Sequence, residues 1–309
     1  MPLVRTRKVT TVLFPLGILL AALLAAAATL RFRTGTGTPQ SPVTRGAEAV
    51  ESNDHPAAAE HFADSAELGP SGLVALQGLA DALVAAQRHE ESVDVYRRIV
   101  ELSPSDPTAR FNLAVALSRA RRFDEAEKLY LQLLSENDAF VQARYNLASL
   151  YQAQGKLRQA VEVWRKVVAQ APHLPSAHTA LGEALMDLGM AGEAMAAYSE
   201  AAKLAPNDAR SWLNLAAAAR AAGSIGRAVV AARRASQLVG TDAAAWRFLG
   251  QQWLELHRVT DKEEFLTRAV EAWRESLLLD PNQPDLREML ETYGAPTTSP
   301  ATNPAKPVP

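Results

Sequence analysis

Residues 144–172 read RYNLASLYQAQGKLRQAVEVWRKVVAQAP, and this stretch decides the fold because its residue classes return at a fixed spacing. Ala148 belongs to a column of small residues that recur every 34 positions, and Ala160 and Trp164 belong to two more columns. The three columns are Gly46, Ala80, Ala114, Ala148, Gly182, Ala216 and Gly250; Ala58, Ser92, Ala126, Ala160, Ala194 and Ala228; and Phe62, Tyr96, Tyr130, Trp164 and Tyr198. Repetition at this period predicts a stacked solenoid, in which function lies on a surface rather than in a pocket.

Each repeat has the pattern of two helices joined by a turn. In the unit 107–140, apolar residues at helical spacing predict a first helix over Ala109–Ala120 and a second over Phe123–Leu134. Later units carry Gly155, Gly189 and Gly223 at the turn, where a left-handed residue often ends a helix.

About seven units are predicted over residues 43–283, ending near residues 70, 104, 138, 172, 206, 240 and 281. The first unit has Pro42 and Arg45 where bulky apolar residues belong, so its first helix, about Val43–Ser52, should be short or loosely packed. The last unit is 41 residues long, and a capping box over Thr260–Glu263 predicts extra turns at the start of its second helix. Residues 284–293 then form a terminal capping helix, and residues 294–309 a disordered proline-rich tail.

With these columns in place, the chain resembles the tetratricopeptide repeat (TPR) family. The family's order of residue types is met by Arg144-Tyr145-Asn146-Leu147-Ala148 followed by Tyr151, Ala160, Trp164 and Pro172, and again by Trp212-Leu213-Asn214-Leu215-Ala216 with Ala228. The resemblance covers about residues 39–283. It implies an all-α, right-handed superhelical solenoid whose first helices line a concave groove.

The amino-terminal region predicts a membrane anchor. Residues 1–8 are basic, and Val9–Leu30 is a run of 22 uncharged residues, long enough to cross a hydrocarbon core of about 30 Å as a helix. A cleaved secretory signal is the alternative, since Ala26-Ala27-Ala28 offers a cleavage site, although the run is longer than a typical signal core. Residues 31–42 then form a flexible linker rich in Gly, Thr and Pro.

Basic residues on both sides of the run leave the orientation open. Arg5, Arg7 and Lys8 outnumber Arg31 and Arg33, which favours a cytoplasmic amino terminus and repeats on the extracytoplasmic side, periplasmic in a bacterium. Secretion after signal cleavage and cytoplasmic repeats are the alternatives.

Charge and motif content exclude several functions. Residues 1–33 hold five basic and no acidic residues, so the remaining 27 basic and 34 acidic residues give the repeat region a net charge of −7. Such a region is a poor nucleic-acid binder. The chain has no cysteine, its six histidines show no paired metal spacing, and no nucleophile, dinucleotide or phosphate-loop motif occurs. We therefore expect no enzyme activity, no metal or other cofactor and no small-molecule substrate.

The candidate site is a peptide-binding groove on the first helices. In the family, an asparagine two residues before the small column often binds the backbone of an extended peptide, and Asn112, Asn146 and Asn214 match that position. The other expected groove residues are Phe111, Tyr145, Gln142, Ser149, Gln152, Glu183, Arg210, Arg220 and Arg247. These side chains could equally be solvated polar residues or, for the two aromatics, inter-helix packing residues. The basic residues with which some family members clamp a terminal carboxylate do not accompany the asparagines.

Two functions remain open on sequence grounds. In the first, the chain is a membrane-tethered scaffold or adaptor whose groove binds a peptide or helix of a partner protein, with the bilayer contacted by residues 9–30. In the second, it is an architectural subunit of a membrane or cell-envelope complex that uses its convex face or its membrane span.

Overall fold

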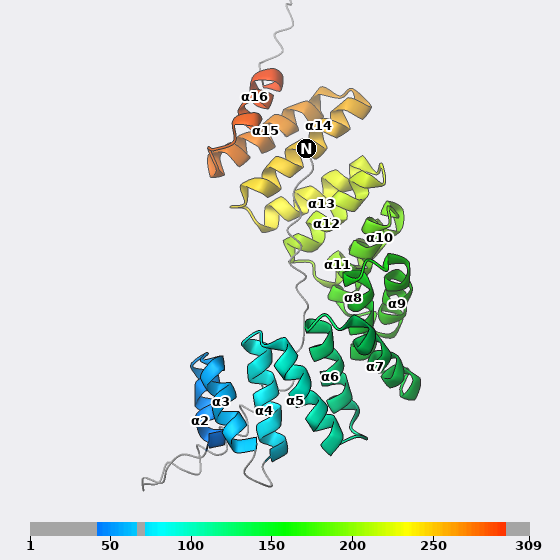
Figure 1. Cartoon of the computed structure of the whole chain (residues 1–309). Coiled ribbons are helices and arrows are strands. Elements are labelled where there is room, and N and C mark those ends of the chain that lie inside the picture. Colours follow the sequence, from blue (N-terminus) through cyan, green and yellow to red (C-terminus); the bar gives the residue numbers. More distant parts are fainter. Residues whose placement is uncertain (1–41, 67–71, 295–309) are drawn as a thin grey trace, which may run out of the picture. The chain divides into compact units, whose positions relative to one another are not determined.

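The computed structural model describes residues 42–66 and 72–294, in which every regular element is an α-helix. The chain divides into two compact units, residues 1–170 and residues 171–309. The described helices of the first unit are α2 to α9, and those of the second are α10 to α16 (Figure 1).

The described part of the first unit, residues 42–66 and 72–170, consists of four helical hairpins. Its helices are α2 (Pro42–Glu51), α3 (His55–Ala66), α4 (Gly72–Ala85), α5 (His89–Leu102), α6 (Pro107–Arg119), α7 (Phe123–Glu136), α8 (Val141–Ala153) and α9 (Leu157–Gln170). Each helix packs against its neighbours in sequence, and α2 also contacts α4 as α6 contacts α8. First helices of successive hairpins therefore lie against one another, which is how a repeat that cannot bury its apolar face alone builds a continuous core.

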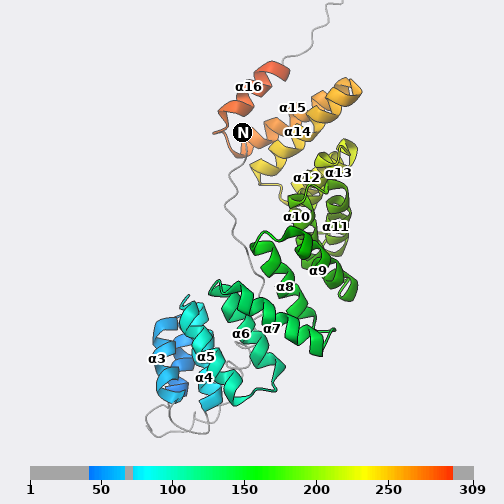
Figure 2. The same ribbon diagram turned by 45° about the vertical axis from the view of Figure 1, so that its right-hand side comes forward.

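Residues 171–294 of the second unit, the part that is described, form three hairpins and a last helix. Its helices are α10 (Pro175–Asp187), α11 (Ala191–Leu204), α12 (Ala209–Ala221), α13 (Ile225–Leu238), α14 (Ala243–Thr260), α15 (Glu263–Leu279) and α16 (Pro284–Tyr293). Figure 2 shows α14 and α15 as the longest hairpin, with α16 beside it. Leu286 of α16 is fully buried in the cluster that contains Trp273, so α16 closes the end of this core.

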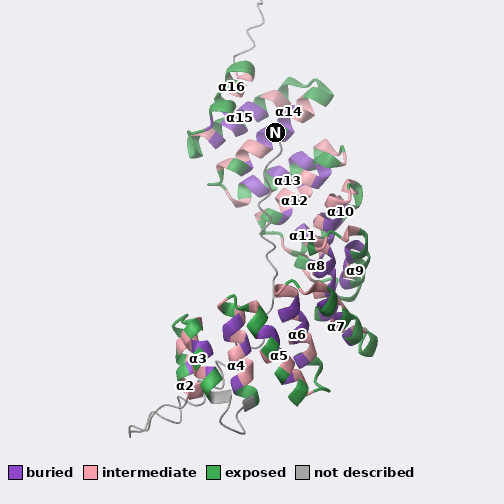
Figure 3. Ribbon diagram, viewed as in Figure 1, coloured by how far each residue is buried: buried purple, intermediate pink, exposed green. Residues whose placement is uncertain are grey.

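The core follows the columns of small and aromatic residues. Ala80, Ala114, Ala148 and Ala216 are completely buried, and the rings of Tyr130 and Trp164 are almost so. Figure 3 shows buried positions along the helix sides that face neighbouring helices within each unit. Where the small column holds glycine, a ring takes the space of the missing Cβ, as Tyr198 does at Gly182.

The turn inside each hairpin uses a left-handed residue in every unit, whether or not that residue is glycine. Gly155, Gly189 and Gly223 have φ angles of +74°, +76° and +72°. Asn53, Gln87 and Arg121, three, two and one periods earlier than Gly155, have φ angles of +59°, +61° and +62°. The repeat geometry therefore imposes a backbone conformation that an L-residue other than glycine adopts only at a cost.

The extra residues of the last hairpin lengthen both helices, which corrects the prediction that they extend only the second. The first helix α14 has 18 residues against 13 in α12, and α15 has 17 against 14 in α13. Thr260 is the last residue of α14 and Asp261 ends it with a left-handed φ of 55°, so the predicted capping box does not form. Because antiparallel helices pack side by side, both arms of the hairpin must extend to bury the added surface.

The other helix bounds shift slightly from the sequence expectation. The helix predicted over Ala109–Ala120 is α6, which begins at Pro107 and ends at Arg119. In α2, a helix of 10 residues, only Gly46 is buried, in keeping with a short or loosely packed first helix. The predicted basic segment 1–8 and span 9–30 lie outside the described residues, as do all of the linker 31–42 except Pro42 and all of the tail 294–309 except Gly294. Within residues 42–66 and 72–294, no helix has the length and apolarity to cross a bilayer.

Candidate interaction surface

The predicted groove residues divide between the two units. Those of the first unit lie on α6 and α8 and are Phe111, Asn112, Gln142, Tyr145, Asn146, Ser149 and Gln152. Those of the second lie on α10, α12 and α14 and are Glu183, Arg210, Asn214, Arg220 and Arg247. The structure thus brings together seven of the twelve in one unit and five in the other.

The two predicted aromatic contact residues are used for packing. The Phe111 ring lies 5.3 Å from that of Phe140 and 6.2 Å from that of Tyr130, between centroids. The Tyr145 ring stands edge-on to Trp164 with a centroid separation of 4.6 Å. Both rings are partly buried, so their main role is to join successive helices.

Four of the predicted polar residues also have internal partners. Asn146 hydrogen-bonds the hydroxyl of Tyr130, whose pKa burial raises to about 12. The Trp164 indole N–H donates to the Gln152 side-chain oxygen at 3.2 Å. Arg247 pairs with Asp285 of α16, and Glu183 has an interaction of its own. These side chains are held in place by the protein and are less free to bind a ligand.

The remaining predicted residues have side chains without a hydrogen bond or ion pair to any described residue. They are Asn112, Gln142, Ser149, Arg210, Asn214 and Arg220. All six are at least partly exposed. The asparagine ladder is therefore reduced to one free amide in each unit, Asn112 in the first and Asn214 in the second.

A polar cluster that the sequence analysis did not single out joins α4, α5 and α6. The Asp81 carboxylate of α4 accepts a hydrogen bond from the Tyr96 hydroxyl at 2.7 Å and one from the Gln77 amide at 3.2 Å. Burial raises the pKa of Asp81, and burial lowers the pKa of the nearby Arg119 guanidinium on α6. Asp81 follows the small column directly, as Ser149 and Glu183 do, so the same spacing rule could have found it.

A second column missed by the sequence analysis fixes the loops between hairpins. Trp212 and Trp246 each donate their indole N–H to a carbonyl oxygen six residues earlier, at 3.0 Å. Arg144 binds the carbonyl of Asp138 in the same way, and His178 Nε2 lies 3.0 Å from that of Pro172. These positions recur every 34 residues and all carry side-chain N–H groups, a shared property that hydrophobicity patterns do not show. Trp212 and Trp246 are partly exposed, so besides packing against other helices they hold the loops between hairpins in place through these hydrogen bonds.

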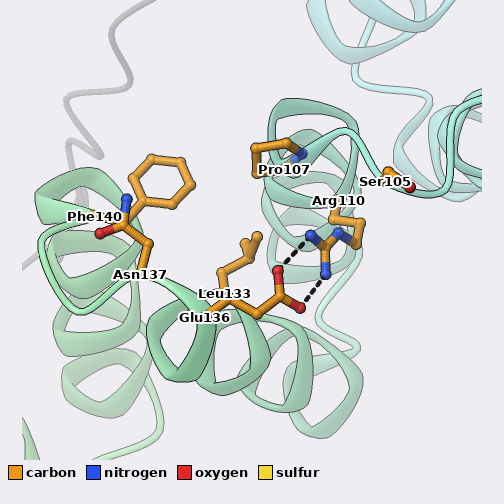
Figure 4. Close-up of a pocket in the computed structure, with 7 residues that line it drawn as sticks. All are labelled: Ser105, Pro107, Arg110, Leu133, Glu136, Asn137 and Phe140. Atoms are coloured by element: carbon orange, nitrogen blue, oxygen red, sulfur yellow. Dashed lines mark hydrogen bonds and ion pairs between the residues drawn. The ribbon is translucent and has the colours of Figure 1, made fainter.

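Arg110, in the same column, departs from this pattern and lines a pocket instead. Its guanidinium makes two hydrogen bonds of 2.6 Å to the Glu136 carboxylate (Figure 4). The pocket, of about 380 Å³, is lined by Ser105, Pro107, Arg110, Leu133, Glu136, Asn137 and Phe140. Because its only cation is already paired within the pocket, the site offers little to a charged ligand.

The second unit has a more apolar pocket on the side of its second helices. The pocket, of about 540 Å³, lies between α11 and α13 with Trp212 and Leu215 of α12 among its lining residues. Its rim includes Val230, which is 58% exposed, and the small residues Ala196 and Gly226. Nothing in it suggests catalysis, and no cluster of three potential metal ligands occurs in the described part of the chain.

A sequence model of the tetratricopeptide repeat matches residues 43–107, 78–140, 111–175 and 145–209 in overlapping register. The chain belongs to the tetratricopeptide repeat family. A comparison with curated proteins finds no match.

Solved tetratricopeptide repeat structures share the fold at low sequence identity. One from Cytophaga hutchinsonii has a TM-score of 0.65 at 15% identity, with 79% of this chain and 98% of that chain covered. One from Parabacteroides merdae has a TM-score of 0.53 at 16% identity, covering 82% and 97%. YrrB, described as a TPR protein with an unusual peptide-binding site, has a TM-score of 0.53 at 16% identity, covering 65% and 99%. These likenesses establish the fold.

Proposed function

We propose that the chain is a membrane-tethered adaptor that binds an extended segment of a partner protein along the first helices of its repeats. The observation that supports this proposal is that the asparagines of one column differ in whether they hydrogen-bond within the chain. Asn112 and Asn214 occupy the peptide-binding position of the family and have no internal partner among the described residues, whereas Asn146 in the same column is bonded to Tyr130. An amide that is held at a repeat surface and not used internally can both donate to and accept from a peptide backbone.

The likeness to YrrB supports the same proposal at the level of fold. YrrB is described as having an unusual peptide-binding site, and this chain covers nearly all of its length. At 16% identity the likeness does not transfer individual contact residues. The residue assignments therefore rest on the contacts described above.

The tether rests on residues 9–30. A run of 22 residues without a charge has the length of a membrane-spanning helix, and the basic residues before it favour a cytoplasmic amino terminus. We propose that the repeats stand on the extracytoplasmic side, linked to the bilayer by residues 31–42. Carbonate extraction of membranes tests the anchor, because an integral span stays in the pellet. Release into the soluble fraction, with the mature protein beginning after the Ala26-Ala27-Ala28 run, contradicts it and indicates a cleaved signal.

Partner capture tests the binding surface. Crosslinking in intact membranes with the wild-type chain and with an Asn112→Ala, Asn214→Ala double variant should show loss of the crosslinked partner in the variant. Its matched control is Gln132→Ala with Gln237→Ala, two exposed amides on second helices. Helicity and melting temperature should be unchanged in both, because none of the four side chains hydrogen-bonds another residue in the described part of the chain. Equal capture by all three proteins refutes binding on the first helices.

An architectural role is the second candidate, and the apolar pocket between α11 and α13 favours it. An exposed valine beside small residues is a surface that another protein's apolar side chain can fill. A Val230→Lys variant that loses the crosslinked partner, while the asparagine variant keeps it, would establish this alternative in place of the first.

A further inference from the structure

Arg119 is an exception among the arginines on helices α5 to α8. Each other arginine on α5 to α8 pairs with a carboxylate: Arg97 with Asp94 and Glu125, Arg98 with Glu101, Arg110 with Glu136 and Arg144 with Asp138. Arg119 makes no hydrogen bond or ion pair with any residue of 42–66 and 72–294. It is nevertheless partly buried, so folding desolvates the guanidinium and no salt bridge offsets the unfavourable free energy of that desolvation.

The neighbouring carboxylate does not fill this gap. Asp81 Oδ1 is taken by Tyr96 and Gln77, and Oδ2 is buried without a hydrogen bond. Asp81 therefore acts on Arg119 only through the longer-range electrostatic attraction between them. The other groups near Arg119 do not supply an anion either, because His89 is a base whose pKa is lowered by burial and by Arg119, and Tyr96 and Tyr130 have raised pKa values.

Asn112 lies on the same face of the helix as Arg119. The two are seven residues apart on α6, which is close to two turns, so their side chains point in nearly the same direction about 10 Å apart. An extended polypeptide rises about 3.3 Å per residue and covers that distance in three residues. A free amide and a free guanidinium are thus spaced to bind the backbone of one segment at one end and an anion at the other.

We propose that Asn112 and Arg119 form a two-point site for an internal acidic segment of the partner, in which Asn112 holds the backbone and Arg119 pairs with an Asp or Glu side chain about three residues away. The inference rests on the proposed function, and it adds the chemistry and spacing of the partner. It uses none of the asparagine-associated basic residues with which other family members clamp a chain terminus.

The test uses an array of 12-residue peptides that are acetylated and amidated at their ends, so that only side chains carry charge. Matched peptides differ in a single Asp or Glu that is replaced by Asn or Gln, and a parallel set has a free carboxyl terminus. The labelled full-length chain should bind acidic peptides more tightly than their amide versions, and this binding should weaken as the salt concentration rises. The Arg119→Gln variant should bind the acidic peptides at least about tenfold more weakly than the wild type does. Arg98→Gln, which removes an exposed arginine of α5, should bind as the wild type does.

Thermal melting provides a second readout, because a purely structural role of Arg119 predicts the opposite change in melting temperature. Arg119→Gln should leave the melting temperature unchanged or higher, because it removes an unpaired, partly buried charge. A lower melting temperature together with unchanged peptide affinity overturns the proposal. Equal binding of acidic and amide peptides, or binding only to free carboxyl termini, overturns it while leaving the adaptor function standing. Failure to bind any peptide overturns both.

Discussion

Gly250 of α14 provides a direct test of how closely the helices of the last hairpin approach each other. A Cβ at this position would lie well under 3.0 Å from the indole of Trp273 and 3.0 Å from the backbone oxygen of Ala269. Trp273 is completely buried, and the backbone of α15 cannot swing away as the end of a flexible side chain can. Gly250→Ala should therefore overpack this contact.

The expected magnitude follows from two opposing effects. Overpacking a tight core costs about 1–3 kcal/mol, and alanine in a helix interior is favoured over glycine by about 1 kcal/mol. Because one of the two close contacts is to backbone, we expect the upper part of the first range and a net loss of about 1–2 kcal/mol. Gly192→Ala on α11, where an added Cβ meets nothing within 4 Å, is the matched control and should gain up to about 1 kcal/mol.

Urea unfolding of the full-length chain, followed by circular dichroism and by tryptophan fluorescence, measures both changes. Since repeat proteins can unfold in parts, the comparison should use the transition that the fluorescence of the second unit reports. Gly250→Ala that is as stable as the wild type, or Gly192→Ala that is as destabilised as Gly250→Ala, would refute the close-approach argument.

Three further predictions follow from the contacts. Arg144→Met should destabilise the first unit by about 1.5–3 kcal/mol, because it leaves the hydrogen-bonding groups of Asp138 and Gln170 without their charged donor. The control Arg98→Met, which removes one partner of an exposed ion pair, should change stability by less than about 1 kcal/mol. Urea titration of both variants measures the difference. Gln87→Gly should raise the melting temperature through a gain of about 1 kcal/mol at a left-handed turn, and Gly155→Ala should lower it by a similar amount; the same sign for both would contradict the reasoning. Burial raises the pKa of Asp81 above its ordinary 3.8, so the folded state binds the carboxyl proton more tightly than the unfolded state does. The stability that this proton contributes is lost as pH rises through the folded-state pKa. Asp81→Asn should therefore be more stable than the wild type at neutral pH, and unfolding measured at a series of pH values should show the difference shrinking on acidification.

The repeat architecture could be predicted from sequence because its determinants are local and recur. The alanine and aromatic columns demand close helix contacts at every period, and the described helices meet that demand. The terminal helix α16 spans Pro284–Tyr293, the range that the sequence predicts. The last hairpin was mispredicted because Thr260–Glu263 matches a capping box in sequence, whereas packing required α14 to continue to Thr260 and end at Asp261.

The candidate site was predicted less well, since a pattern shows which side chains share a helix face but not which partners they find. Phe111, Tyr145 and Asn146 match binding positions yet contact neighbouring helices. Arg119 drew no attention in the sequence because an arginine near a helix end is ordinary.

By itself, the sequence determined that this protein is a stack of helical hairpins, because a period of 34 residues with small and aromatic columns can bury its apolar faces only by stacking. Tertiary structure alone decided which polar groups are satisfied internally and which remain free. That distinction depends on distances between residues 15 to 38 positions apart, such as Tyr96 to Asp81 and Arg247 to Asp285, which only the packed hairpins bring within hydrogen-bonding range.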